Sequence, residues 1–237
     1  MRVRMITAAT STEEAQRDAR VAILAVGSFE QHGGHLPLAT DTIVAETIAA
    51  RLAESYDLFR LPPITMSCSH EHAGFAGTVS ISAGTLIATI ADVRASLAGL
   101  GITRLVLVNG HGGNYVLSNI AQEANVGGAA VALFPGKHDV SAARAAAGME
   151  STADEDMHGG EWETSILLHA HPELVREDYA EADHDAPVRP HLHLTGMAGY
   201  TKSGIIGYPS RATAAKGAQV LDSLVESFRE LLDALTH

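Results

Sequence analysis

Three short and continuously apolar segments constrain the fold of this chain most strongly. They read VAILAV at 21–26, RLVLVN at 104–109 and AAVALF at 129–134, and polar residues flank each of them. Runs of this length without polar alternation are typical of strands that are buried on both faces of a sheet. Strands of that kind pair in parallel, because the connecting helices then cover both faces. The segments therefore predict a mostly parallel, enclosed sheet.

Segments with helical spacing of apolar residues lie between and after these strands. They cover 42–55, 84–99 and 113–126, and an apolar stripe along 220–235 predicts a C-terminal helix. Strands that alternate with helices predict the α/β class with helices on both sides of the sheet. The alternating segment TVSIS at 78–82 could add an edge strand.

The net charge and the lack of targeting or membrane-spanning segments in the sequence limit the kinds of binding partner to expect. The chain has 16 basic and 28 acidic residues, a net charge of -12 at pH 7, which would repel phosphate backbones and anionic lipid surfaces. It shows neither a signal peptide nor a run long enough to span a bilayer. The single cysteine, Cys68, allows no internal disulfide and agrees with a reducing compartment. We expect an unprocessed, soluble cytoplasmic protein that binds neither nucleic acid nor membranes.

Three stretches carry the residues that point to chemistry. Ligands bind at the carboxyl ends of the strands in open α/β sheets, and GSFEQHGGHLPLATD (27–41) and NGHGGN (109–114) each follow a predicted strand. The third stretch, DEDMHGGEWETS (154–165), begins a predicted helix. Their acidic and imidazole side chains of interest are Glu30, His32, Asp41, His111, His158, Glu161 and Glu163.

The spacing of these residues favours a metal site without deciding each role. Glu30 and His32 are two apart, so they share a face if the extended conformation persists past the strand. Asp41 could cap the next helix or bridge two cations about 3.5–4 Å apart. His111, between glycines, could be a metal ligand, a general base or a structural histidine. A mixture of Glu, Asp and His without sulfur suits zinc, manganese or ferrous iron.

Such a centre predicts hydrolysis. Two cations can share a hydroxide, lower its pKa toward neutrality and polarise a neighbouring carbonyl, and amide hydrolysis is the natural use of that arrangement. A histidine free of the metals would then give a proton to the departing nitrogen, and His158 is the candidate for this shuttle. Two alternatives remain: a non-catalytic metal-binding scaffold, and a metal-dependent isomerase or lyase.

The motifs together resemble the creatininase family, which contains creatinine amidohydrolases and mycofactocin precursor peptide peptidase-like metal-dependent hydrolases. The family pattern G-S-x-E-Q-H-G-x-H-L-P-x-x-T-D, N-G-H-G-G-N and H-x-G-x-x-E-T-S occurs here in the same order. The segments 70–81 and 204–217 are also similar to the family. The resemblance implies one creatininase-like domain over 1–237, a three-layer α/β/α sandwich, and a homohexamer built as a trimer of dimers.

The resemblance also implies a site of two divalent metal ions per subunit, zinc first and manganese or iron as possibilities. The implied ligands are Glu30, His32, His111 and a bridging Asp41, with proton transfer by His158. Creatinine-cleaving members carry H-Y-E where this chain has His111, Gly112 and Gly113, and glycine cannot ligate.

The resemblance offers two replacements for the missing carboxylate. Glu163 would complete the second metal site and take part in catalysis, as in members that share the H-G-G form. Glu161 is the fallback, although a solvated carboxylate at a helix start is the expected role for that residue.

The substrate is expected to be a small molecule, such as a formamide or a cyclic amide, or a short peptide. Creatinine itself is disfavoured, because creatinine-cleaving members have tryptophans before the catalytic histidine, whereas the only tryptophan here, Trp162, follows His158 and is expected to serve packing. His35 is expected to orient a ligand carboxylate. The turn 70–72 is expected to line the pocket, and the segment 172–204 to be a surface excursion that forms a lid or a subunit contact.

Overall fold

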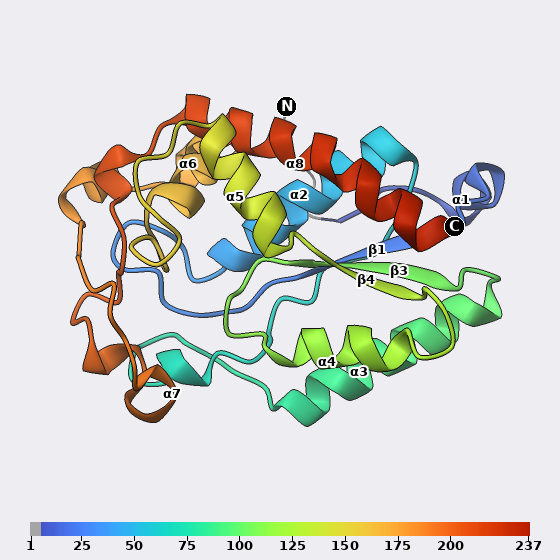
Figure 1. Cartoon of the computed structure of the whole chain (residues 1–237), viewed down its shortest axis with the longest axis horizontal. Coiled ribbons are helices and arrows are strands. Elements are labelled where there is room, and N and C mark those ends of the chain that lie inside the picture. Colours follow the sequence, from blue (N-terminus) through green and yellow to red (C-terminus); the bar gives the residue numbers. More distant parts are fainter. Residues whose placement is uncertain (1–5) are drawn as a thin grey trace.

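The computed structural model describes residues 6–237, and these form three layers with a sheet between two sets of helices (Figure 1). The sheet is parallel and has the strand order β2-β1-β3-β4. Its strands are β1 (Val21–Val26), β2 (Phe59–Arg60), β3 (Arg104–Asn109) and β4 (Val131–Phe134). The predicted α/β sandwich with a parallel central sheet is confirmed.

Helices cover both faces of the sheet, as Figure 1 shows. One face carries α2 (Thr40–Tyr56), α5 (Lys137–Ala146), α6 (Glu161–Ala170) and α8 (Ala214–Thr236), and the other carries α3 (Ala83–Gly99) and α4 (Val116–Ala124). The helix α1 (Ser11–Arg17) has no buried residue. The remaining helices are short: η1 (His70–His72), η2 (Pro172–Leu174), η3 (Glu177–Glu181), α7 (Leu192–Thr195), η4 (Met197–Gly199) and η5 (Pro209–Arg211).

The two faces of the sheet explain why the strand segments are apolar throughout. Side chains along β1 alternate between two hydrophobic clusters, with Ile23 in the cluster under α2 and α8 and Leu24 in the cluster with α3 and α4. All six residues of β1 are buried. A polar residue at any of these positions would therefore enter a core.

The predicted stripe of the last helix is also in the core. Val220, Leu221, Leu224, Phe228 and Leu235 of α8 are buried. Phe228 packs edge-on against Phe134 of β4, with ring centroids 5.2 Å apart.

The expected strand at 78–82 is wrong. This segment makes one isolated antiparallel bridge, between Val79 and Phe29, and Val79 is 48% exposed. Its polar and apolar alternation therefore reflects an irregular surface segment. The structure also adds α1, β2 and α5, which the apolar pattern does not predict, and β4 begins at 131 rather than at 129.

Within residues 6–237, no helix has the length and apolar character needed to cross a lipid bilayer. The first five residues of the predicted domain lie outside the described residues.

A buried carboxylate on α2 gives the fold a testable pH dependence. Glu46 is fully buried, and Arg60 Nη2 lies 2.7 Å from its Oε1. Burial raises the pKa of Glu46 to about 7, with Arg60 opposing the rise. A carboxyl that holds its proton longer in the folded state contributes stability below its unfolded pKa, and this contribution is lost as the pH rises through about 7.

We expect the stability difference between the native protein and Glu46→Gln to change with pH. Between pH 5 and pH 8 the native protein should lose about 2–3 kcal/mol relative to the variant, because glutamine does not titrate. Urea denaturation of both proteins at the two pH values measures this, with the exposed Glu54→Gln on the same helix as the control. Parallel stability curves for native protein and Glu46→Gln would contradict the assignment.

Candidate metal centre

Two glycines allow the start of α2 to approach the carboxyl ends of two strands. A Cβ atom on Gly27, after β1, would overlap the backbone of Thr42, and one on Gly110, after β3, would overlap the carbonyl oxygen of Asp41. Glycine removes both clashes. The first turn of α2 therefore sits directly on this edge of the sheet and carries Asp41 into it.

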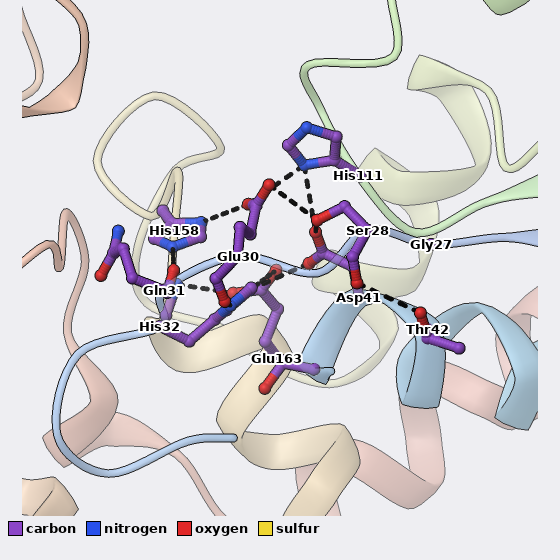
Figure 2. A network of polar contacts seen from close by, with 12 residues as sticks. Gly27, Ser28, Glu30, Gln31, His32, Asp41, Thr42, His111, His158 and Glu163 are labelled. Carbon is purple, nitrogen blue, oxygen red and sulfur yellow. Dashed lines mark hydrogen bonds and ion pairs between the residues drawn. The ribbon is translucent and has the colours of Figure 1, made fainter. Parts of the chain in front are cut away.

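Six side chains from three stretches converge at this edge (Figure 2). They are Glu30, His32, Asp41, His111, His158 and Glu163. Their nitrogen and oxygen atoms form three overlapping donor groups, each within 4.8 Å: Glu30 with Asp41 and His111, His32 with Asp41 and Glu163, and Glu30 with His32 and His158. The first five of these side chains are buried.

Asp41 belongs to two of the groups and faces each with a different oxygen. Its Oδ1 lies 2.9 Å from Nε2 of His32, and its Oδ2 lies 3.0 Å from Nδ1 of His111. A carboxylate that turns one oxygen to each side has the form needed to be shared between two cations.

The three histidines of the cluster all keep one ring nitrogen pointed inward. Backbone carbonyl groups accept from the outer nitrogens: Glu30 from His32 Nδ1 at 3.1 Å, Cys68 from His111 Nε2 at 2.9 Å, and Gln31 from His158 Nε2 at 2.6 Å. A neutral imidazole with its N–H committed in this way has a lone pair on its other nitrogen. The inner nitrogens face carboxylate oxygens, so a proton or a cation is required between them.

Glu30 supplies the clearest indication of a cation site. Its buried Oε1 makes no hydrogen bond, although the ring nitrogens of His72 and His111 each lie 3.2 Å away. The other oxygen, Oε2, accepts from Ser28 Oγ at 2.7 Å. A buried carboxylate oxygen among imidazole nitrogens fits a divalent cation, because Glu, Asp and His are the ligands that zinc and manganese take.

The pKa shifts of the clustered side chains also show that the cluster favours positive charge beside its carboxylates. Burial disfavours the charged forms of His32 and His111, but Asp41 beside them raises both pKa values well above the usual range. Burial likewise opposes the ionised form of Asp41, and His32 outweighs this and lowers the pKa of the carboxyl. In the absence of metal, protons on the imidazoles take the place of cations.

Glu163 lies in the first turn of α6, at the open side of the cluster. Its Oε1 is 3.7 Å from Nε2 of His32, and its Oε2 accepts from the backbone N–H of Gly159 at 2.5 Å. Among the residues of the cluster it is the most exposed side chain, at 13%.

The sequence reasoning missed two contributions to the cluster, those of Ser28 and of the contact between His72 and Glu30. Ser28 Oγ lies 2.8 Å from Asp41 Oδ2 as well as beside Glu30, so it spans the two carboxylates. His72 is buried against Glu30, and its Nδ1 is 2.9 Å from Nε2 of Gln31. The serine of the G-S-x-E motif was the available signal for the first. The position of His72 depends on a long-range contact that no local spacing reveals.

Among the described residues, His35 makes no hydrogen bond to a ligand carboxylate; it acts on Glu163 through Gly159, whose carbonyl it contacts and whose N–H donates to Glu163. Its Nε2 lies 3.0 Å from the carbonyl oxygen of Gly159 and 3.3 Å from Oγ1 of Thr164. The ring therefore holds the turn that precedes α6.

Glu161 is buried rather than solvated, which corrects the expectation for this residue. Lys216 Nζ donates to its Oε1 at 2.6 Å, and Ser151 donates to its Oε2 from Oγ at 2.5 Å. Burial opposes its charge, but Lys216 and Ser151 lower its pKa. The carboxylate is thus committed to a structural network, and none of the candidate donor groups in the described chain includes it.

We expect Glu161→Ala to destabilise the fold by about 2–4 kcal/mol, because it removes the acceptor of Ser151 Oγ and the charged partner of Lys216, which keeps only the carbonyl oxygen of Arg211. The metal content should stay at the native value. Denaturant titration and elemental analysis of the same preparation measure the two quantities. A lower metal content at unchanged stability would assign Glu161 to the metals instead.

One cavity adjoins the cluster, and a second lies beside that cavity. The metal-centre cavity has a volume of about 470 Å³, and its lining includes His111 and His158 together with Glu71 and His72. The side cavity next to it measures about 540 Å³. The expectation that 70–72 lines the pocket is confirmed. The excursion 172–204 also lines the metal-centre cavity of its own subunit, through Arg189, Pro190, Leu192 and His193.

Trp162 has the packing role that was expected. It is half-buried, packs against the core cluster below α2 and α8, and has the Arg144 guanidinium 6.0 Å from its ring centroid.

The sequence is similar to a protein family and to characterised relatives. The family model described as creatininase, creatinine amidohydrolase, matches residues 7–232. The mycofactocin precursor peptide peptidase of Mycolicibacterium smegmatis is 36% identical over 214 residues, which are 86% of this chain and 80% of the relative. The creatinine amidohydrolase of Pseudomonas putida is 26% identical over 230 residues, 90% and 88% of the two chains.

Solved structures show the same fold. A crystal structure of creatinine amidohydrolase superposes with a TM-score of 0.81 and 25% identity, and 95% of each chain is covered. A mutant creatininase described as the Zn-Zn type has a TM-score of 0.79 at 25% identity and covers 96% of both chains. A manganese form of creatininase gives a TM-score of 0.80 at 24% identity, with 95% of each chain covered.

Proposed function

The chain belongs to the creatininase family of hydrolases that act on C–N amide bonds, and from this premise we propose that it hydrolyses an amide by a two-metal mechanism with His158 as the proton shuttle. The substrate is a small-molecule amide or a short peptide. The single observation that carries the proposal is the inward orientation of the three imidazoles, whose free nitrogens face carboxylate oxygens.

The donor atoms divide between two positions that share Asp41. Glu30, His111 and one oxygen of Asp41 would hold the first cation, and His32, Glu163 and the other oxygen of Asp41 would hold the second. A Zn-Zn form and a manganese form are known among the related creatininases, and the donor set suits zinc, which we place first, as well as manganese or iron. Bound there, the cations would supply Lewis acidity toward a water molecule and an amide carbonyl.

The protein's own residues arrange the rest of the site. Ser28 sits between Glu30 and Asp41 and keeps both carboxylates turned toward the imidazoles. His35 fixes Gly159, whose N–H holds Glu163 in place. Glu163 thereby joins catalysis by keeping the second position complete.

His158 has the geometry of a proton carrier. Burial lowers its pKa and His32 adds to the effect, so the ring is neutral near pH 7 and able to accept a proton. Its Nε2–H is fixed on the carbonyl of Gln31, and its free Nδ1 faces Glu30 Oε1 at 3.7 Å. A proton taken up at Nδ1 can pass to the leaving nitrogen of the amide.

The proposal also includes three predictions, on the oligomeric state, the location and the domain organisation of the protein. The chain forms a homohexamer, a trimer of dimers; it resides in the cytoplasm; and residues 1–237 form one domain. The alignments support the last of these, since they cover 86% and 90% of this chain and 80% and 88% of the two relatives.

We expect purified protein to hold two divalent ions per chain and to hydrolyse at least one class in a panel of formamides, cyclic amides and short peptides. Chelator treatment should abolish the activity, and zinc or manganese should restore it. Elemental analysis and product detection by mass spectrometry measure both. Protein that holds two ions and cleaves none of the panel would favour a metal-binding scaffold, and protein that binds no ion would refute the proposal.

A further inference from the structure

Glu71 lies where the metal-centre cavity and the side cavity meet, and it lines both. It is the central residue of η1, and 15% of its side chain is exposed. A Cβ atom on residue 113 would overlap the Oε1 of Glu71. The carboxylate therefore occupies the space in which a side chain at position 113 would begin, and Gly113 leaves that space open.

Burial opposes the ionised form of Glu71, but His111 beside it lowers the pKa of the carboxyl, so Glu71 carries its charge. The basic side chain nearest to it is His111, whose Nε2 lies 3.4 Å from Oε1. That Nε2 already donates to the carbonyl of Cys68 at the shorter distance of 2.9 Å. Arg189, the arginine that lines the metal-centre cavity, donates from Nη1 to the carbonyl oxygens of Asp154, at 2.9 Å, and Ala186.

The His111 N–H that stabilises this charge is shared with the carbonyl of Cys68, so a cationic ligand would add a full ion pair to Glu71. Pockets use a few such polar groups to fix the orientation of a ligand. Only the ring of His111 separates Glu71 from the metal centre, because the opposite ring nitrogen, Nδ1, lies 3.0 Å from Asp41. A cation held by Glu71 would thus belong to the part of the substrate next to the reacting amide.

We propose that Glu71 binds the protonated amine of a short-peptide substrate at the junction of the two cavities. This inference rests on the proposed amide hydrolysis and narrows its substrate class from amides in general to amides beside a free amine. The side cavity has the lining for the neighbouring apolar side chain, with short or apolar residues that include Ala73, Gly74, Ala83, Val116, Leu192 and Ala198.

The binding test uses leucinol, which has an amine and an apolar side chain but no amide bond, and 4-methylpentan-1-ol, which lacks only the amine. Calorimetry on the metal-loaded protein should show leucinol binding about ten- to hundredfold more tightly, as expected for a charge-assisted hydrogen bond. Glu71→Gln should abolish the difference with unchanged metal content, and Glu71→Asp should keep part of it. The exposed Glu123→Gln on α4 is the charge-matched control and should behave as the native protein.

The kinetic test compares leucyl-alanine amide with its N-acetylated form. The native protein should favour the free amine by a similar factor in kcat/KM, and Glu71→Gln should remove the preference. Three outcomes would each overturn the inference, even if amides are hydrolysed. Leucinol could bind no better than 4-methylpentan-1-ol, or not measurably at all. The preference could also survive in Glu71→Gln, which would place the amine on a metal. A preference that depends on Glu71 without hydrolysis of any amide would support the inference and refute the proposed function.

Discussion

Asp41→Ala is expected to reduce the metal content from two ions per chain to none, and amide hydrolysis to background. Both candidate positions use this carboxylate, with Oδ1 toward His32 and Oδ2 toward His111. Without it, each position keeps two donor side chains from the groups of three. Elemental analysis after dialysis against micromolar zinc measures the loss directly, independently of any substrate.

Glu163→Gln is the matched comparison, because it changes a carboxylate that only one position uses. This variant should keep one of the two ions. If Asp41→Ala retains two ions and full turnover, the shared role of Asp41 is wrong. If it keeps one ion, Asp41 serves a single position and Glu30 joins the two.

The fold of Asp41→Ala should remain intact, which separates metal loss from unfolding. The start of α2 has no side-chain capping bond in the structure, so Asp41 is not needed as a cap. Without Asp41, burial favours the neutral forms of His32 and His111, so both imidazoles can release the proton that the carboxylate held and leave no unpaired buried charge. Circular dichroism and a denaturant curve at pH 7 should therefore resemble those of metal-free native protein.

Much of the fold could be predicted because apolar side chains are buried in the core, so the apolar pattern of the sequence shows which faces of the strands and helices pack. The continuously apolar β1 and β3 are enclosed by helices on both faces, and the apolar stripe of α8 lies on the core. The expectation failed at 78–82, where alternation belongs to a segment that lacks a partner strand in the described structure. Local periodicity reports which side of a segment is apolar, not which segment pairs with it.

The candidate site was predictable where its residues follow strand ends. Glu30 and His111 come directly after β1 and β3, so the parallel sheet brings them to the same edge. The prediction for Glu161 failed. A charged residue in the first turn of a helix is usually solvated, but Glu161 is buried because Lys216, 55 residues further along the chain, donates a hydrogen bond to it. Partners of that separation are set by tertiary packing and leave no local signal.

His158→Ala is expected to keep both metal ions while kcat falls by about 10²- to 10⁴-fold, the usual range for a lost general acid or base. KM should change little, since the ring acts on the proton and not on the position of the substrate. His138→Ala is the control, because His138 is exposed on α5 and lines neither cavity. A loss of metal in His158→Ala would instead assign the ring to the donor group with Glu30 and His32.

The variant His158→Gln separates proton transfer from positioning. A glutamine amide can still donate to the carbonyl of Gln31, which His158 Nε2 contacts at 2.6 Å, but it cannot take up a proton at neutral pH. If His158 carries the proton, His158→Gln should be as slow as His158→Ala while its stability stays near that of the native protein. If the ring only packs between His32 and His72, whose centroids lie 4.1 Å and 4.4 Å away, the glutamine should restore most of the rate. Native-like turnover in His158→Gln would therefore remove His158 from the chemistry and leave the two cation positions to act with a proton donor from solvent.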